Sequence, residues 1–185
     1  VVTPRYSPLA EQQLLDKPEQ PVAIMLPAWD ESAVIRPMLM NTLRTLAYGN
    51  YHVFVGTYPN DKDTQREVDE VCAISDRVHK VVTADPGPTC KADCLNWIYS
   101  GIRNYERESG IEFQIFVMQD CEDVIHPLCY RIFNWLIPRK DMVQLPVLSL
   151  ARKWHEFTAS HYIDEFAQLH NKDMVVREAI NRSVP

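Results

Sequence analysis

Three carboxylates stand close together at Asp120, Glu122 and Asp123. They follow the apolar run 115–118, which has the composition of a buried strand. In open α/β sheets, the carboxyl ends of strands are where ligands bind. Because neighbouring carboxylates repel one another, each needs a cation, a donor or a proton to balance its charge. A divalent cation that carries phosphate oxygens would balance them, since hard cations prefer oxygen ligands.

The same carboxylates also allow a purely structural explanation. The residues that follow, Val124-Ile125-His126-Pro127, include a proline, and proline is favoured in the first turn of a helix. Carboxylates are stabilising at a helix N-terminus. Taken alone, the motif therefore leaves a ligand site and a helix N-terminus equally open.

Apolar patterns around this motif predict strands and helices in alternation. Apolar runs predict strands at 21–27, 52–58, 79–85 and 115–118, and a fifth at 143–148. Helical spacing predicts helices over 33–47, after Asn60-Asp61 with a buried stripe of Val68, Val71 and Ile74, after Thr89, and through 132–136. This alternation indicates an α/β fold with a doubly wound, mostly parallel sheet.

Charged residues also follow other predicted strands. Asp30 and Glu31 follow the first strand, and Asp85 follows the third. Since parallel strands end at the same edge of a sheet, we expect these carboxylates to gather near residues 120–123. Lys91 begins a predicted helix, where its ammonium and the free backbone N–H groups could bind phosphate. Asp61, after the second strand, could serve a ligand or cap the next helix.

Composition narrows the class of protein. The chain has 185 residues and a net charge of -6, which argues against a nucleic-acid-binding surface. Its five cysteines form no CxxC pair, so we expect reduced thiols in the cytosol. No apolar run approaches the ~18 residues of a membrane span, and no signal peptide is visible. The first and last residues look like neither a start nor a cap, so we expect an excised part of a longer protein.

Three segments, in order, resemble the donor half of family 2 glycosyltransferases of the GT-A type. Residues 26–32 (Leu-Pro-Ala-Trp-Asp-Glu-Ser) are similar to that family's Pro-Ala-Tyr-Asn-Glu signature. Residues 86–96 are similar to its Gly-Lys-Ala-x-Ala-Leu-Asn segment, and Asp120-Cys121-Glu122-Asp123 lies where the family has Asp-x-Asp. The resemblance implies a GT-A (Rossmann-like) subdomain over 21–150, after a lead-in at 1–20. Residues 151–185 would be an amphipathic helical segment that begins a truncated acceptor half.

The resemblance also implies roles for residues. Glu122 would bind Mg²⁺ or Mn²⁺, with support from Asp123. The nucleotide-sugar donor, expected to be a UDP-sugar, would be transferred to a saccharide acceptor by an inverting mechanism. The residues implied in donor binding are Asp30, Glu31, Asp61, Asp85, Lys91 and Asp120.

Some positions depart from the family pattern. Tyr58 stands near the place of an Asp that usually follows the second strand, and Glu122 replaces the second Asp of Asp-x-Asp. The Thr-Glu-Asp-like segment that carries the catalytic base does not occur. No catalytic residue is therefore assigned, and we expect the chain to be inactive by itself.

Within the family, residues 27–31, 56–61 and 119–123 resemble a phage-adsorption group of bacterial inner-membrane glycosyltransferases. That resemblance implies a site on the cytoplasmic face of the inner membrane, with membrane contact through flanking segments absent from this chain. A non-catalytic receptor or docking module of a surface assembly is the alternative. A nucleotidyltransferase would carry a Gly-rich loop after the first strand, and residues 28–31 are unlike one.

Overall fold

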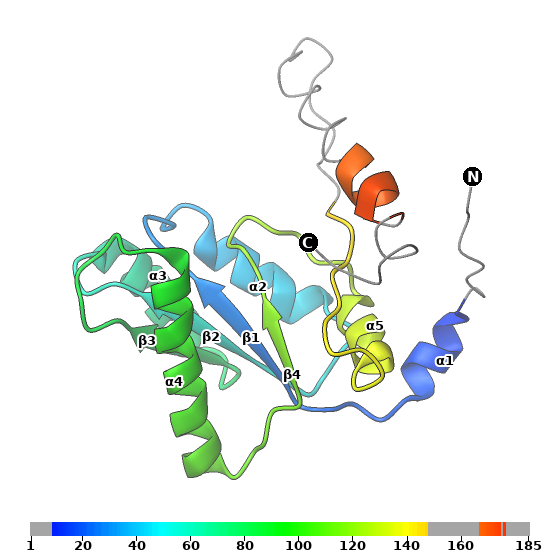
Figure 1. The fold of residues 1–185 in the computed structure, drawn as a ribbon. Coiled ribbons are helices and arrows are strands. Elements are labelled where there is room, and N and C mark those ends of the chain that lie inside the picture. The colour runs from blue at the N-terminus through cyan, green and yellow to red at the C-terminus, as the bar shows by residue number, and fades with distance from the viewer. Residues whose placement is uncertain (1–8, 148–166, 175, 177–185) are drawn as a thin grey trace. The chain divides into compact units, whose positions relative to one another are not determined.

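Residues 9–147, 167–174 and 176 are described by the computed structural model (Figure 1). The chain divides into two compact units. One is Ala10–Arg139, and the other combines Val1–Leu9 with Lys140–Pro185.

The larger unit is built on a four-stranded sheet with the strand order β3-β2-β1-β4. All three strand pairs are parallel, as the alternating pattern predicts. The central strand β1 is buried over residues 22–26, which explains its continuous apolar run. The strands are β1 Val22–Pro27, β2 Tyr51–Thr57, β3 Val78–Val82 and β4 Ile115–Met118.

Helices cover both faces of this sheet, as expected for a doubly wound fold (Figure 1). On one face, α2, α3 and α5 form a core that includes Ile35, Val68 and Tyr130. On the other face, α4 packs through Ile98 and Ile102. The helices of this unit are α1 Glu11–Asp16, α2 Ile35–Thr45, α3 Lys62–Cys72, α4 Lys91–Ser109 and α5 Cys129–Leu136.

The predicted buried stripe of α3 is correct at two of its three positions. Val68 and Val71 are fully buried, whereas Ile74 is 65% exposed. The helix ends at Cys72, so helical spacing no longer directs the side chain of Ile74 toward the core. The prediction of a buried Ile74 is therefore wrong.

The end of α4 is set by Gly110. This residue takes the left-handed conformation, with φ of 75°, and its N–H donates to the carbonyl of Glu106 at 2.9 Å. Glycine adopts this conformation without steric cost, which makes it the usual residue after a helix. The chain can then turn back and enter β4, which ends at the same edge of the sheet as β1.

The lead-in before β1 is anchored on α5. Asn134 is fully buried, and its side-chain carbonyl accepts a hydrogen bond from Gln20 Nε2 at 2.9 Å. Its amide nitrogen donates to the carbonyl of Pro18 at 3.0 Å. Residues 10–20 thus belong to the larger unit and include the short helix α1, while residues 1–8 lie outside the described part.

The second unit corrects one prediction. Residues 143–147 form no strand, although their apolar pattern suggested one, and Leu148 lies outside the described residues. Pro146 has no N–H for a strand ladder, and a short apolar run cannot by itself separate a strand from an irregular segment.

The predicted amphipathic segment 151–185 is described only in part. Residues 167–174 and 176 are helical, with a π-helical turn at Leu169–Asp173. The aromatic residues on which the prediction rested, Trp154, Phe157 and Phe166, lie outside the described residues. In the described parts of the chain, no helix is both long and apolar enough to cross a membrane.

Candidate functional site

A pocket of about 340 Å³ lies where the strand order reverses, at the carboxyl ends of β1 and β4. Open α/β sheets bind their ligands at such switch points, because the loops on either side diverge there. The residues that line it come from the end of β1, from the loops after β1, β2, β3 and β4, and from the start of α4. They are Pro27, Ala28, Trp29, Glu31, Tyr58, Pro88, Thr89, Lys91, Cys94, Asp120, Cys121 and Glu122.

One side of the pocket is acidic. Glu31 comes from the loop after β1, and Asp120 and Glu122 come from the turn after β4. Burial raises the pKa of Glu31, and the negative charge of Glu122 raises it further, followed by smaller effects of other carboxylates. The three carboxylates therefore lie close enough to repel one another, and they would be stabilised by a cation.

The thiol between these carboxylates stays protonated. Burial, and then the charge of Glu31, raises the pKa of Cys121 to about 12. Its Sγ donates to the carbonyl of Pro27 at 3.4 Å, which ties the end of β4 to the end of β1. Cys121 thus acts as a small packing residue between the two loops.

Lys91 lines the pocket together with these carboxylates. Lys91 is the first residue of α4, as predicted, and its ammonium forms an ion pair with Asp120 Oδ1. Both side chains remain about half exposed, at 57% and 48%. The pocket thus combines a lysine at a helix N-terminus with carboxylates at strand ends, and it can offer partners to phosphate and to a metal ion.

Two aromatic side chains also line the pocket. Trp29 and Tyr58 meet edge to face, with ring centroids 5.2 Å apart. Gly87 lies against both rings, since a Cβ there would come within 2.6 Å of each. Asn60 holds Gly87 through two hydrogen bonds of 2.7 Å, one to its carbonyl and one from its N–H. Only glycine fits at this position, so the turn at 86–89 closes tightly over the two rings.

The loop after β1 is held by the start of α3. Asp30 has a φ of 57°, and its N–H donates to Asp61 Oδ2 at 2.7 Å. Asp61 Oδ1 accepts from the N–H of Thr64 at 3.2 Å, so Asp61 caps α3. The expectation of a helix cap is confirmed. Neither Asp30 nor Asp61 lines the pocket, and their roles in donor binding stay predictions.

Asp85 is not brought into the pocket with the other carboxylates. It follows β3, and β2 lies between β3 and β1. Neighbouring strands are about 4.8 Å apart, so two strand spacings separate the end of β3 from the end of β1. In the pocket, the expected gathering of strand-end carboxylates therefore holds for Glu31, Asp120 and Glu122 but not for Asp30 or Asp85.

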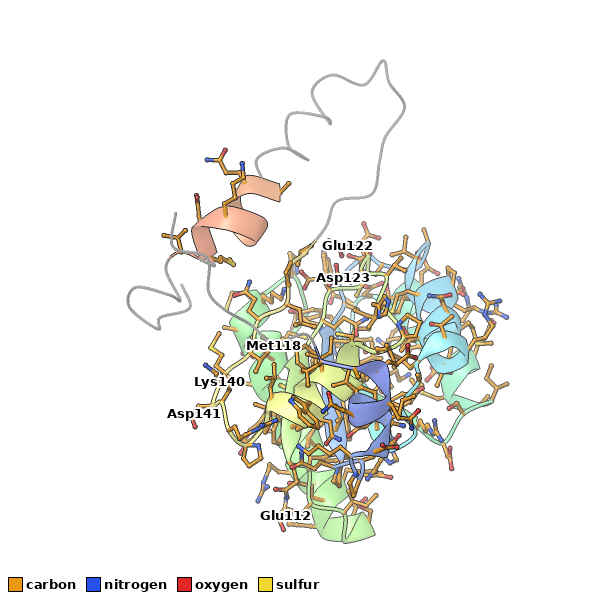
Figure 2. All side chains as sticks on the ribbon, turned by 90° about the vertical axis from the view of Figure 1, so that its right-hand side faces the viewer. Glu112, Met118, Glu122, Asp123, Lys140 and Asp141 are labelled. Carbon is orange, nitrogen blue, oxygen red and sulfur yellow. The ribbon has the colours of Figure 1, made fainter. Side chains whose placement is uncertain are left out.

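Asp123 lies beside the pocket and does not line it. Its Oδ2 accepts from the N–H of Asp120 at 3.4 Å, and burial raises its pKa. Figure 2 shows Glu122 and Asp123 together, at the end of the larger unit away from Glu112. Asp123 thus stabilises the turn that carries Asp120 and Glu122.

Sequence reasoning assigned no role to several residues of the pocket. Trp29, Thr89 and Cys94 line it, although only charged residues had been singled out. Thr89 Oγ1 lies 2.9 Å from the Tyr58 hydroxyl and donates to Asp93 Oδ2 at 2.8 Å. The Pro-Gly-Pro-Thr turn at residues 86–89 was the sequence signal that could have pointed to Thr89 and Cys94, because it brings the start of α4 against the loop after β2.

The donor atoms of the pocket suit a hard divalent cation. Glu31, Asp120 and Glu122 offer carboxylate oxygens, which Mg²⁺ and Mn²⁺ prefer. Within residues 9–147, 167–174 and 176, however, no three such side chains are already arranged around one point. Asp120 in particular is occupied by Lys91, so a metal ion would have to compete with that ion pair.

A family model described as "Glycosyltransferase like family 2" matches residues 18–185. The chain belongs to this family. The match includes all four strands and every residue of the pocket. Membership of family 2 agrees with the parallel sheet and with the pocket at its switch point.

Two curated proteins match nearly the whole chain. Bacteriophage adsorption protein B of Escherichia coli strain K12 is 52% identical over 181 residues, or 98% of this chain. Bacteriophage N4 adsorption protein B of Escherichia coli O157:H7 matches with the same identity and coverage. The chain spans only 24% of the length of each of these relatives.

A solved glycosyltransferase has the same fold. The mannosyltransferase PcManGT from Pyrobaculum calidifontis, in complex with GDP-Man and Mn²⁺, aligns with a TM-score of 0.50 at 17% identity. The alignment covers 80% of this chain and 42% of that protein. The predicted GT-A architecture is thereby confirmed.

Proposed function

We propose that the pocket is the donor site of a glycosyltransferase, where a nucleoside diphosphate sugar binds together with Mg²⁺ or Mn²⁺. One observation carries the proposal: Glu31, Asp120 and Glu122 line the same pocket as Lys91. A diphosphate requires cations around it, and an acidic pocket can supply them by holding a divalent metal. The metal-bound donor of the structural neighbour supports this assignment.

The roles follow from position. Lys91 and the free N–H groups at the start of α4 would bind phosphate oxygens. Glu122 would hold the metal, with Asp123 supporting its turn, and Asp120 would contact the sugar or ribose. When bound, the metal would neutralise charge on the departing nucleoside diphosphate. Asp30, Asp61 and Asp85 do not line the pocket and would act on the donor from outside it.

For the intact protein, we propose transfer of the sugar to a saccharide acceptor of the cell envelope. In an inverting reaction, a base removes the proton of an acceptor hydroxyl, which attacks the anomeric carbon in line. We assign no residue of this chain as that base. The relatives are named for bacteriophage adsorption, which supports a place in the bacterial envelope. We propose the cytoplasmic face of the inner membrane.

The second candidate is a non-catalytic docking module for a surface assembly or a phage. Two observations favour it: the names of the relatives, and the ion pair by which Lys91 and Asp120 already neutralise each other. A module of this kind would keep the fold and would have no need of a nucleotide.

Calorimetry on the 185-residue chain separates the two candidates. UDP and GDP are titrated in turn, each with and without Mn²⁺. The donor-site proposal predicts binding that requires Mn²⁺, with a dissociation constant between roughly 1 μM and 1 mM, the usual range of substrate affinities. It also predicts that Glu122→Gln abolishes the metal requirement together with most of the affinity.

Glu112→Gln is the matched control, since Glu112 is exposed and lies at the other end of the larger unit (Figure 2). This variant should bind like the wild type. If folded wild-type protein binds neither nucleotide in the presence of Mn²⁺, the donor-site proposal fails and the docking module gains support.

A further inference from the structure

The loop that delivers Glu31 to the pocket begins with a residue in an uncommon conformation. Asp30 has a φ of 57°, in the left-handed region that residues other than glycine, asparagine and aspartate seldom adopt. Glu31 follows directly and lines the pocket. The direction of the Glu31 side chain therefore depends on what holds Asp30 in this conformation.

A carboxylate on another element supplies that hold. Asp61 uses both of its oxygens: Oδ1 accepts from Thr64 N–H at 3.2 Å, and Oδ2 accepts from Asp30 N–H at 2.7 Å. A helix cap needs only the first of these bonds. The second joins residues 31 positions apart in the sequence and fixes the N–H of the left-handed residue itself.

The rest of the first turn of α3 holds the same region. Thr64 is fully buried, and its Oγ1 accepts from the N–H of Glu31 at 3.0 Å. Gln65 is also buried, and its Nε2 donates to the carbonyl of Tyr58 at 2.6 Å. Consecutive N–H groups at Asp30 and Glu31 are thus satisfied by side chains of one helical turn.

We propose that Asp61 is a positioning residue of the donor site: its carboxylate holds Asp30 in the left-handed conformation and thereby directs Glu31 into the pocket. This inference rests on the proposed function of that pocket. It assigns Asp61 an action through the loop after β1, without contact with the donor. It also explains why an aspartate, with two oxygens, stands where a serine would suffice to cap α3.

Asp61→Ser separates the two tasks of Asp61. Serine caps helices as well as aspartate does, so α3 should keep its cap and the variant should melt near the wild-type temperature. Serine lacks the second carboxylate oxygen that reaches Asp30, so an oxygen placed to accept from Thr64 N–H leaves Asp30 N–H without this acceptor. We expect the Asp30 and Glu31 amides, followed by NMR, to exchange at least about tenfold faster, because local opening governs their exchange.

The binding readout uses GDP and UDP with Mn²⁺. We expect Asp61→Ser to weaken binding about fivefold or more, because Glu31 is no longer held in the pocket. Asp63→Ser is the matched control: it removes the same charge from the same helical turn, where Asp63 pairs with Arg66 at 2.8 Å and does not contact the loop. This control should leave both exchange and affinity unchanged.

A double-mutant cycle tests the coupling directly. In Asp30→Gly, the left-handed conformation costs nothing, so adding Asp61→Ser should have a clearly smaller effect than it has in the wild-type background. Equal effects in both backgrounds would overturn the proposal, as would wild-type exchange and affinity in Asp61→Ser.

Two further outcomes stay distinguishable. If Asp61→Ser fails to fold, Thr64→Val removes the acceptor of Glu31 N–H, keeps Asp61 in place and should loosen the same amides. If wild-type protein binds neither nucleotide, the proposed function fails. Amide exchange at Asp30 and Glu31 then decides alone whether Asp61 holds this loop.

Discussion

Lys91 and Asp120 form an ion pair that joins the first residue of α4 to the turn after β4. Both side chains line the pocket. Lys91, which would bind phosphate, and Asp120, which lies beside the proposed metal site, therefore neutralise each other. A metal-bound donor would exchange this one pair for two new contacts, phosphate with Lys91 and sugar or ribose with Asp120, whose charge would also lie near the metal held by Glu122. Binding of metal and binding of nucleotide should then be coupled through these two residues.

Replacement of Lys91 by methionine should separate the two ligands. Without the ammonium, the negative charge of Asp120 beside Glu122 is no longer neutralised, so we expect Mn²⁺ alone to bind more tightly, by about two- to fivefold, as expected for loss of an exposed ion pair. Nucleotide should bind about tenfold more weakly in the presence of Mn²⁺, since a phosphate contact is lost. Isothermal titration of Mn²⁺ and then of GDP or UDP measures both effects.

Lys62→Met is the control for this experiment. Lys62 is the first residue of α3, as Lys91 is of α4, and it is exposed and outside the pocket. The same loss of charge there should alter neither affinity. A weaker affinity of Lys91→Met for Mn²⁺ alone would contradict the view that the ion pair competes with the metal.

Replacement of Glu31 by glutamine should stabilise the fold and weaken the site. Burial, and then the charge of Glu122, raises the pKa of Glu31, so its ionised form is unfavourable in the folded chain. This destabilisation is complete when the pH lies above the pKa that Glu31 has in the folded chain. It disappears as the pH falls below the pKa that Glu31 has in the unfolded chain. At neutral pH we therefore expect Glu31→Gln to melt at a higher temperature than the wild type.

The difference in melting temperature between Glu31→Gln and the wild type should vanish below about pH 4, where the Glu31 carboxyl group is protonated in both the folded and the unfolded chain. Calorimetric melting over a series of pH values measures it, and Mn²⁺ should raise the melting temperature of the wild type more than that of the variant. Glu112→Gln, at an exposed position, should show neither effect. A lower melting temperature of Glu31→Gln at neutral pH would count against repulsion among these carboxylates.

The fold was largely predictable because its strands leave strong local signals. The runs that became β1 and β2 are apolar since these central parallel strands are buried on both faces, whereas the edge strands β3 and β4 are buried only in part. Lys91 at the start of α4 and the carboxylates after β4 could also be placed, because each lies next to an element boundary. Such positions follow from the chain order alone.

Contacts that depend on the lateral order of strands could not be predicted. Asp85 follows β3 just as Glu31 follows β1, but only Glu31 lines the pocket, and β2 lies between β3 and β1 in the sheet. The bond between Asp61 and Asp30 N–H joins two loops and leaves no periodic pattern. The apolar run at 143–147 had the composition of a strand but contains Pro146, which lacks a ladder donor.

The close packing of α4 on β2 makes Gly56 sensitive to any added side chain. A Cβ there would lie 2.6 Å from Cys94 Sγ and 2.8 Å from Ile98 Cδ1. We expect Gly56→Ala to reduce the free energy of unfolding by about 1–3 kcal/mol through overpacking, measured by urea denaturation. Cys94→Ala should recover part of this loss, which a double-mutant cycle would detect as coupling.

Gly49→Ala is the control for this substitution. A Cβ at Gly49 would meet only Glu19 Oε2, at 3.2 Å, which is the end of a flexible side chain. Its effect on the free energy of unfolding should stay within about 0.5 kcal/mol, as for most surface substitutions. If Gly49→Ala and Gly56→Ala lowered the free energy of unfolding equally, α4 would be shown to shift easily to accommodate an added methyl group.

Acid should destabilise the fold through His79. Burial, and then the neighbouring His52, lowers the pKa of His79 to about 4, while Asp76 opposes this shift. Because the unfolded chain binds the proton more readily, stability is lost as pH falls from about 6.5 toward 4. His79→Phe keeps an aromatic ring against Phe54, which stacks on His79 at 4.8 Å, and removes the titrating group. We therefore expect the free energy of unfolding of His79→Phe to depend less steeply on pH over this interval, as measured by urea denaturation at several pH values.

His126→Gln is the control, because His126 is exposed, and its free energy of unfolding should depend on pH as steeply as that of the wild type. If His79→Phe also kept the wild-type pH dependence, groups other than His79 would govern the acid sensitivity of the fold.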